Sequence, residues 1–79
     1  MKILRYILEL DSNNNVDGLC RIIETETELW GEYYDGNGIW KEDDYVTISY
    51  IREPGNGEFF HDEEYAKEIM AYIDANSSY

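Results

Sequence analysis

Positively charged side chains are scarce in this sequence, which argues against a protein that binds nucleic acid directly. Six Lys and Arg are dispersed among 79 residues, against eighteen Asp and Glu, and the formal net charge is −12. Binding to phosphates needs clustered Lys and Arg, because these cations displace the counterions of the nucleic acid. An anionic membrane surface repels such a chain for the same reason. We therefore expect neither nucleic acid nor a membrane as a direct partner.

Cysteine and long apolar runs are also scarce. The single cysteine, Cys20, forbids a disulfide within the chain and favours a reducing compartment. The apolar N-terminal segment 1–10 is interrupted by Arg5 and Glu9 and lacks a small-residue cleavage site, so it does not resemble a signal peptide. No stretch approaches the length of a membrane-spanning helix. These features predict a cytoplasmic protein.

No strong catalytic, metal-binding or phosphate-binding motif is present. A nucleophile–base pair would require Cys20 and His61 to converge, and Cys20 lies within a predicted strand. The alternating Asp and Asn residues of segment 11–17 lack the glycine and the bidentate glutamate of a calcium loop. The sequence therefore predicts no enzymatic activity, no metal site and no cofactor.

Aromatic and aliphatic residues are plentiful enough for a folded core. The chain is 43% hydrophobic and 15% aromatic, which is too apolar for a disordered acidic tail. Its length allows one domain, residues 1–79. A folded body with an acidic, aromatic surface suggests a partner with a basic groove.

Strand-like segments occupy most of the first fifty residues. Alternation or β-branched and aromatic enrichment marks 2–10, 19–23, 29–34, a return strand starting at 39–40, and 45–51. Asp-Gly and Asn-Gly at 35–38 supply a tight hairpin turn, and the Pro- and Gly-containing segment 53–57 ends the last strand.

The C-terminal segment 62–75 has helical periodicity. Its apolar residues Ala66, Ile69, Met70 and Ile73 recur at i, i+3, i+4 and i+7, and His61 or Asp62 caps its start. The predicted fold class is α+β: an antiparallel β-meander of about four strands with one C-terminal α-helix packed on a face.

Acidic residues recur at every second position after the second strand. Continued as a strand, Glu24, Glu26 and Glu28 would form a ladder of carboxylates about 6.6–6.8 Å apart, followed on the same face by Trp30 and Glu32. Such a row resembles one nucleic-acid backbone in spacing and sign, and Trp30 would offer a stacking surface. The alternative is a solvated, Glu-rich turn, and the sequence leaves both open.

A second acidic group lies at 42–44, between two predicted strands. Solubility needs a net charge of only about 2–8 in magnitude for a small domain, so this chain exceeds the requirement. We therefore treat the acidic groups and their neighbouring aromatics as candidate partner-binding residues. They are Glu24, Glu26, Glu28, Trp30, Glu32, Tyr34, Glu42, Asp43 and Asp44.

In size, acidity and lack of catalytic residues, the chain resembles small phage-encoded inhibitors, among them anti-CRISPR proteins and other DNA mimics. The segments 18–21, 35–40 and 63–70 also resemble stretches of small uncharacterised bacterial and phage proteins. The resemblance implies a phage-encoded protein that acts in the host cytoplasm.

These observations favour a non-enzymatic acidic inhibitor that occupies the basic nucleic-acid-binding groove of a larger protein. The alternative is a small protein-interaction or regulatory module without nucleic-acid mimicry. A small-ligand sensor would need an apolar pocket between sheet and helix, for which 79 residues leave little room.

Overall fold

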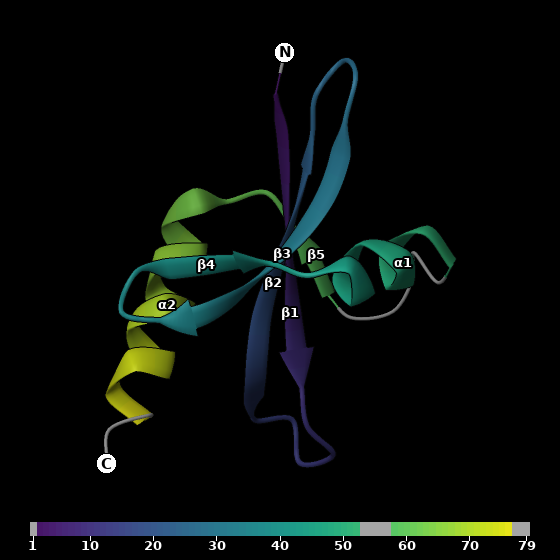
Figure 1. Ribbon diagram of the computed structural model, residues 1–79. Coiled ribbons are helices and arrows are strands. Elements are labelled where there is room, and N and C mark those ends of the chain that lie inside the picture. Colours follow the sequence, from purple (N-terminus) through teal and green to yellow (C-terminus); the bar gives the residue numbers. More distant parts are fainter. Residues whose placement is uncertain (1, 53–57, 77–79) are drawn as a thin grey trace.

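An antiparallel sheet with a helix on each face forms the fold (Figure 1). The computed structural model describes residues 2–52 and 58–76. Its strands and helices follow in chain order: β1 (Ile3–Leu10), β2 (Val16–Glu24), β3 (Leu29–Gly36), β4 (Ile39–Glu42), α1 (Asp44–Arg52), β5 (Glu58–Phe60) and α2 (Glu63–Asn76).

The strands β1 to β4 form a meander in which each strand pairs with the next. β5 then pairs with the free side of β1, so the order across the sheet is β4-β3-β2-β1-β5. The predicted α+β class, the four-strand meander and the C-terminal helix are confirmed. The prediction of only about four strands and one helix was incomplete, because β5 and α1 are also present.

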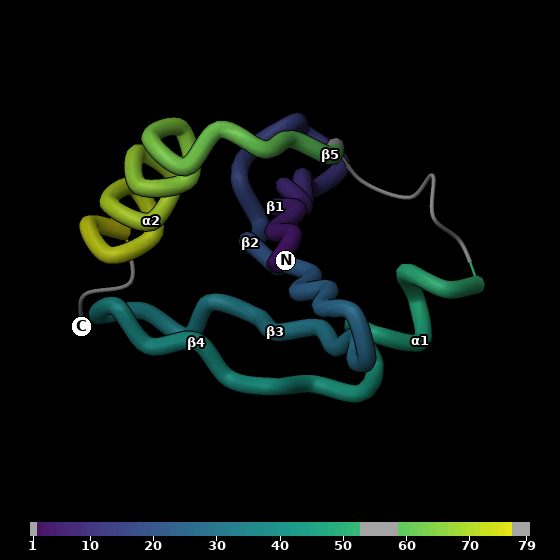
Figure 2. The backbone as a smooth tube through the Cα atoms, turned by 90° about the horizontal axis from the view of Figure 1, so that it is seen from above, coloured from purple at the N-terminus to yellow at the C-terminus, as the bar shows by residue number. Residues whose placement is uncertain are grey.

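Alternating strand residues build an apolar cluster on each face of the sheet. Figure 2, in which β1 is seen nearly end-on, shows α2 and α1 on opposite sides of β1 and β2. The cluster beneath α2 contains Tyr6, Leu8, Leu19, Tyr34, Ala66 and Ile69. The cluster on the other face contains Ile7, Cys20 and Ile22, with Val46 and Tyr50 of α1 packed against it.

The helix α2 matches the predicted helix closely. The side chain of Asp62 caps it, because Oδ1 accepts a hydrogen bond from the backbone N–H of Glu64 at 2.9 Å. Ala66 and Ile69 are buried on the sheet, and Met70 and Ile73 pack at the border of the same cluster. The predicted apolar stripe therefore attaches α2 to the sheet.

The prediction of a strand over 45–51 was wrong, since this segment forms α1. Asp43 starts the helix: its Oδ1 accepts the N–H of Tyr45 at 2.8 Å, and its carbonyl accepts the N–H of Thr47 at 3.3 Å. Val46 and Tyr50 are four residues apart and meet the sheet together. Capping and tertiary packing thus outweigh the strand preference of the β-branched residues here. The predicted turn at 53–57 lies outside the described residues.

Candidate partner-binding surface

The acidic row after β2 forms a turn and not a strand. β2 ends at Glu24 and β3 begins at Leu29, so the regular ladder of carboxylates does not exist. Thr25 closes the turn: its N–H donates to the carbonyl of Glu28 at 2.8 Å, and its Oγ1 accepts the N–H of Glu28 at 3.0 Å. Glu26 and Glu28 lie exposed at the tip. The turn interpretation is therefore confirmed.

Glu24, the first residue of that row, forms an ion pair across the sheet. Its Oε1 accepts a hydrogen bond from Nη1 of Arg5 at 2.8 Å, and its side chain is 40% exposed. This hydrogen bond raises the pKa of the Arg5 guanidinium above its ordinary value. Glu24 therefore contributes less free negative charge to the surface than the sequence suggested.

Trp30 and Glu32 lie on the face of β3 that points toward α2, and they bind each other. The indole Nε1 of Trp30 donates to Oε2 of Glu32 at 3.1 Å, and Nε of Arg21 donates to Oε1 at 2.6 Å. The Arg21 guanidinium also lies 4.1 Å from the ring centroid of Trp40, a cation–π contact. Glu32, only 17% exposed, mainly organises this cluster. Sequence reasoning missed Arg21, because strand register alone brings it opposite Glu32.

Tyr34 is buried and does not offer its ring to a partner, contrary to the sequence-based expectation. Its hydroxyl donates to the carboxylate of Asp74 at 2.9 Å and accepts the N–H of Gly38 at 2.8 Å. Asp74 also accepts the N–H of Asn37 at 3.0 Å. Burial raises the pKa of Tyr34 above its ordinary value. The residue therefore joins the β3–β4 turn to the end of α2.

The turn between β3 and β4 needs the backbone freedom that its sequence provides. Gly36, Asn37 and Gly38 all have positive φ, at 99°, 56° and 77°. Asn and Gly are the residues that adopt this region at low cost. The hairpin predicted from Asp-Gly and Asn-Gly is confirmed, and it sets where β4 begins.

The second acidic group lies where β4 leads into α1. Glu42 ends the edge strand and is exposed, Asp43 is half-buried at the cap of α1, and Asp44 is exposed in the first turn. The helix dipole favours negative charge at this position. We refer to these three residues, Glu42, Asp43 and Asp44, as the acidic edge. Asp43 has a structural role in addition to its charge, whereas Glu42 and Asp44 face solvent.

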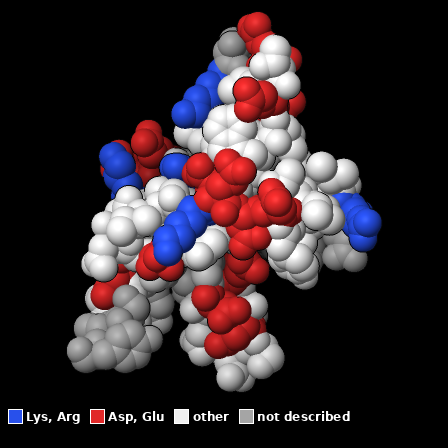
Figure 3. All heavy atoms as spheres, in the orientation of Figure 1, with Lys and Arg blue, Asp and Glu red and all other residues white. Residues whose placement is uncertain are grey.

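Acidic side chains gather on the side of the molecule that presents this edge. Figure 3 shows a band of Asp and Glu that crosses the centre of the view, where β4 meets α1, and continues below it. More acidic side chains lie near the top of the view, where Figure 1 places the β2–β3 turn. The molecule measures 39 × 25 × 21 Å. Its long dimension corresponds to about eleven base pairs at a rise of roughly 3.4 Å.

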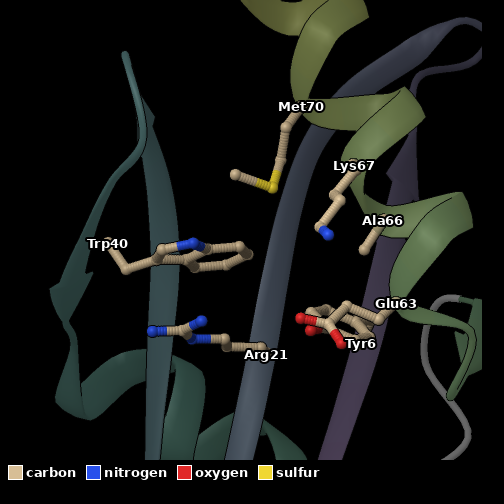
Figure 4. Close-up of a pocket in the computed structure, with 7 residues that line it drawn as sticks. All are labelled: Tyr6, Arg21, Trp40, Glu63, Ala66, Lys67 and Met70. Carbon is tan, nitrogen blue, oxygen red and sulfur yellow. The ribbon is translucent and has the colours of Figure 1, made fainter.

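A small hollow lies between the sheet and α2 (Figure 4). Trp40 and Arg21 stack on one side of it, while Glu63 and Lys67 of α2 approach from the other side. Its volume is about 120 Å³, below the range of about 300–1,000 Å³ that is usual for small-molecule sites. The hollow therefore gives no support to a small-ligand sensor. It is lined by Tyr6, Arg21, Trp40, Glu63, Ala66, Lys67 and Met70.

An exposed apolar face of α1 was missed by the strand prediction. Tyr45, Ile48 and Ile51 are exposed, and we call these three residues the α1 apolar face. Their spacing of three residues, directly after the cap Asp43 and the acidic first-turn residue Asp44, is the signal that would have identified them as one side of a helix. In a strand, Ile48 would instead have pointed to the face opposite Tyr45 and Ile51.

The residues with catalytic potential have structural partners. Cys20 is buried, and its thiol donates to Oε1 of Glu9 at 3.0 Å. His61 is exposed, with Nδ1 at 3.1 Å from the carbonyl oxygen of Leu4. Within residues 2–52 and 58–76, no group of three or more His, Cys, Asp or Glu is arranged to hold a metal ion. The helices of the same region are too short or too polar to cross a membrane.

No protein-family model, curated protein or solved structure matches this chain.

Proposed function

We propose that this protein is a non-enzymatic inhibitor that binds the basic, nucleic-acid-binding surface of a larger protein. The observation that carries the proposal is the excess of negative charge. Six Lys and Arg can neutralise at most six of the eighteen carboxylates one to one. Ion pairs such as Arg5–Glu24 and Arg21–Glu32 already engage some of those few cations. An excess of twelve negative charges therefore remains to attract a basic partner.

The placement of the carboxylates supports a binding role. Glu26 and Glu28 lie at the tip of one hairpin, Glu42 ends the edge strand β4, and Asp44 begins α1. Hydrogen-bonded strands and a capped helix hold these positions, so the charges are displayed on ordered elements and not on a flexible tail. A surface of this sign steers a basic partner into encounter and raises the association rate by about 10–10³-fold. DNA or RNA would compete for the same basic surface.

The cost of the charge also favours a binding role over solubility alone. Two unit charges 7 Å apart in water repel by roughly 0.6 kcal/mol, and such repulsions accumulate over a small surface. A domain of this size has a small margin of stability, about 3–5 kcal/mol. Retaining a charge of −12 in this setting therefore suggests that the charge has a use.

A second candidate function is a protein-interaction module without nucleic-acid mimicry. The α1 apolar face favours it, because exposed aromatic and aliphatic residues on one helix are suited to protein contacts of any charge. The two functions differ in one respect: only the inhibitor competes with nucleic acid for its partner.

The test compares two variants that remove the same charge at different places. The first is Glu42→Gln with Asp43→Asn and Asp44→Asn, in which the amide oxygen introduced at position 43 can still cap α1. The matched control is Glu63→Gln, Glu64→Gln and Glu68→Gln on α2, which lies behind the β4 edge in the view of Figure 1. Partners captured from cell extract on the wild-type protein are identified, and their binding kinetics are measured with each variant.

We expect the acidic-edge variant to associate about three- to ten-fold more slowly than the wild type, with a weaker salt dependence. The α2 control should change the association rate less, and DNA or RNA should displace the captured partner. If nucleic acid does not displace it, the inhibitor proposal fails and the interaction module takes its place. Equal effects of both variants would show that total charge matters and the acidic edge does not.

A further inference from the structure

We propose that the α1 apolar face docks a basic amphipathic segment of the partner, in which apolar side chains are flanked by Lys and Arg. This inference rests on the proposed function for the charge of the partner and adds the chemistry of its contact. The acidic edge then accelerates encounter, and the α1 apolar face holds the complex together.

The exposure of α1 carries the first step. Tyr45, Ile48 and Ile51 are 76%, 48% and 65% exposed, and none of the nine residues of α1 is fully buried. Single exposed apolar residues are common on protein surfaces, but three on one side of one short helix form a patch. The opposite side of α1 already contacts the sheet through Val46 and Tyr50. The exposed side is therefore not needed to attach the helix.

The charges around the patch indicate which kind of partner fits. The acidic edge adjoins the N-terminal end of α1, and Arg52 ends the helix. In Figure 3, an uncharged surface separates the central acidic band from Lys and Arg side chains at the right margin, the side on which Figure 1 places α1. A second copy of this chain would bring another charge of −12 to the interface. Repulsion between the two copies disfavours self-association, whereas a basic segment is attracted.

The dimensions suit a helical segment of the partner. Nine residues of α-helix extend about 13 Å, which matches roughly two to three turns of a second helix. Aromatic residues such as Tyr45 are enriched among residues that dominate binding energy. Apolar residues of the partner would cover the α1 apolar face, and its Lys and Arg would meet Glu42 and Asp44.

The test uses two labelled synthetic peptides of about 18 residues, roughly five helical turns, made of Leu and Lys. One peptide places Leu at i, i+3, i+4 and i+7, and the other has the same composition in scrambled order. The α1 variant carries Tyr45→Gln, Ile48→Gln and Ile51→Gln, because Gln favours helix at least as well as the residues it replaces. The matched control carries Ile39→Gln and Tyr72→Gln, which are 51% and 47% exposed on other elements.

We expect the wild type and the matched control to bind the amphipathic peptide at least about ten-fold more tightly than the scrambled one, as measured by fluorescence anisotropy. The α1 variant should lose this preference, while the acidic-edge variant should weaken the binding of both peptides. Circular dichroism checks that α1 remains folded. Should the triple variant unfold, Ile51→Gln alone should reduce the preference about three-fold.

If the folded α1 variant still prefers the amphipathic peptide over the scrambled one, the inference is wrong. This result would say nothing about whether nucleic acid competes for the partner, so the proposed function would stand. A wild-type dimer in sedimentation experiments that the α1 variant abolishes would also overturn the inference, because a second copy would then occupy the face. If nucleic acid fails to displace the captured partner, the proposed function falls, and the peptide result still decides the inference.

Discussion

Gly31 is a residue of β3 at which α1 approaches the sheet closely. A Cβ atom at this position would lie 2.6 Å from Cγ1 of Val46 and 2.9 Å from the backbone nitrogen of Thr47. The glycine also bonds to the helix from both sides: its N–H donates to Oγ1 of Thr47 at 2.7 Å, and its carbonyl accepts the N–H of Asp43 at 3.0 Å. A strand with a side chain here would have to push α1 away.

We therefore expect Gly31→Ala to lower the free energy of unfolding by about 1–3 kcal/mol, the usual cost of overpacking against backbone. Gly18→Ala is the matched control, because its Cβ would meet only Oε1 of Glu9 at 3.6 Å, an ordinary contact. The control should stay within about 0.5 kcal/mol of the wild type. Urea denaturation measures both, and equal losses would show that α1 does not press on Gly31.

Cys20 is a buried thiol whose chemistry reports on opening of the sheet. Burial, with the hydrogen bond to Glu9 as a second cause, raises the pKa of Cys20 far above its ordinary value of 9.0. The folded state thus retains a proton that the unfolded state loses as the pH rises past about 9. The stability from this group is fully present below the unfolded pKa and falls at higher pH.

Labelling of Cys20 with a maleimide at about pH 8 should therefore be slow, roughly 100-fold slower than in urea above the unfolding midpoint. The thiolate is the reactive form, and both its burial and its raised pKa suppress it. Moderate urea below the midpoint should accelerate labelling in proportion to opening. Fast labelling without urea would contradict the burial of this strand residue.

At the scale of elements, the two helices show what the sequence can and cannot predict. The helix α2 has a cap at Asp62 and a four-residue apolar stripe over about two turns, so its periodicity identifies it without the tertiary structure. The helix α1 is short and contains Val46, Thr47 and Ile48, which favour strands. Its packing on the sheet depends on Gly31, which precedes the contacting Val46 by 15 residues, and no local pattern contains that contact.

The candidate partner-binding surface, like the helices, was predictable only in part. Acidity and the exposure of Glu26, Glu28, Glu42 and Asp44 follow from composition and from turn signals. The burial of Tyr34 and the clamping of Glu32 by Arg21 depend on strand register and on the position of α2. Strand register depends on the whole sheet. The alternation within β3 alone therefore could not indicate that Glu32 and Tyr34 have structural roles.

At the scale of the whole molecule, attraction within ion pairs and repulsion among carboxylates oppose each other, and salt separates them. Ion pairs such as Arg5–Glu24 and Arg21–Glu32 stabilise the fold, by about 0.2–1 kcal/mol each where they are partly exposed. Repulsion among the excess carboxylates destabilises it, and at a net charge of −12 on 79 residues we expect repulsion to be the stronger of the two. Screening weakens both, so the sign of the salt effect shows which of them dominates.

We therefore expect the melting temperature to rise as salt increases from about 0.01 M to 0.15 M, where the Debye length falls from about 30 Å to 8 Å. At the higher salt, the Debye length is shorter than the smallest dimension of the molecule, 21 Å. Repulsion between carboxylates on distant parts of the surface is therefore largely screened. The acidic-edge variant lacks three of the charges and should show a smaller rise, with a higher melting temperature at low salt. Differential scanning calorimetry at matched pH measures both proteins. A melting temperature that falls with salt would mean that the ion pairs dominate. The excess charge would then not destabilise the fold, and its cost in stability would no longer argue for a binding function.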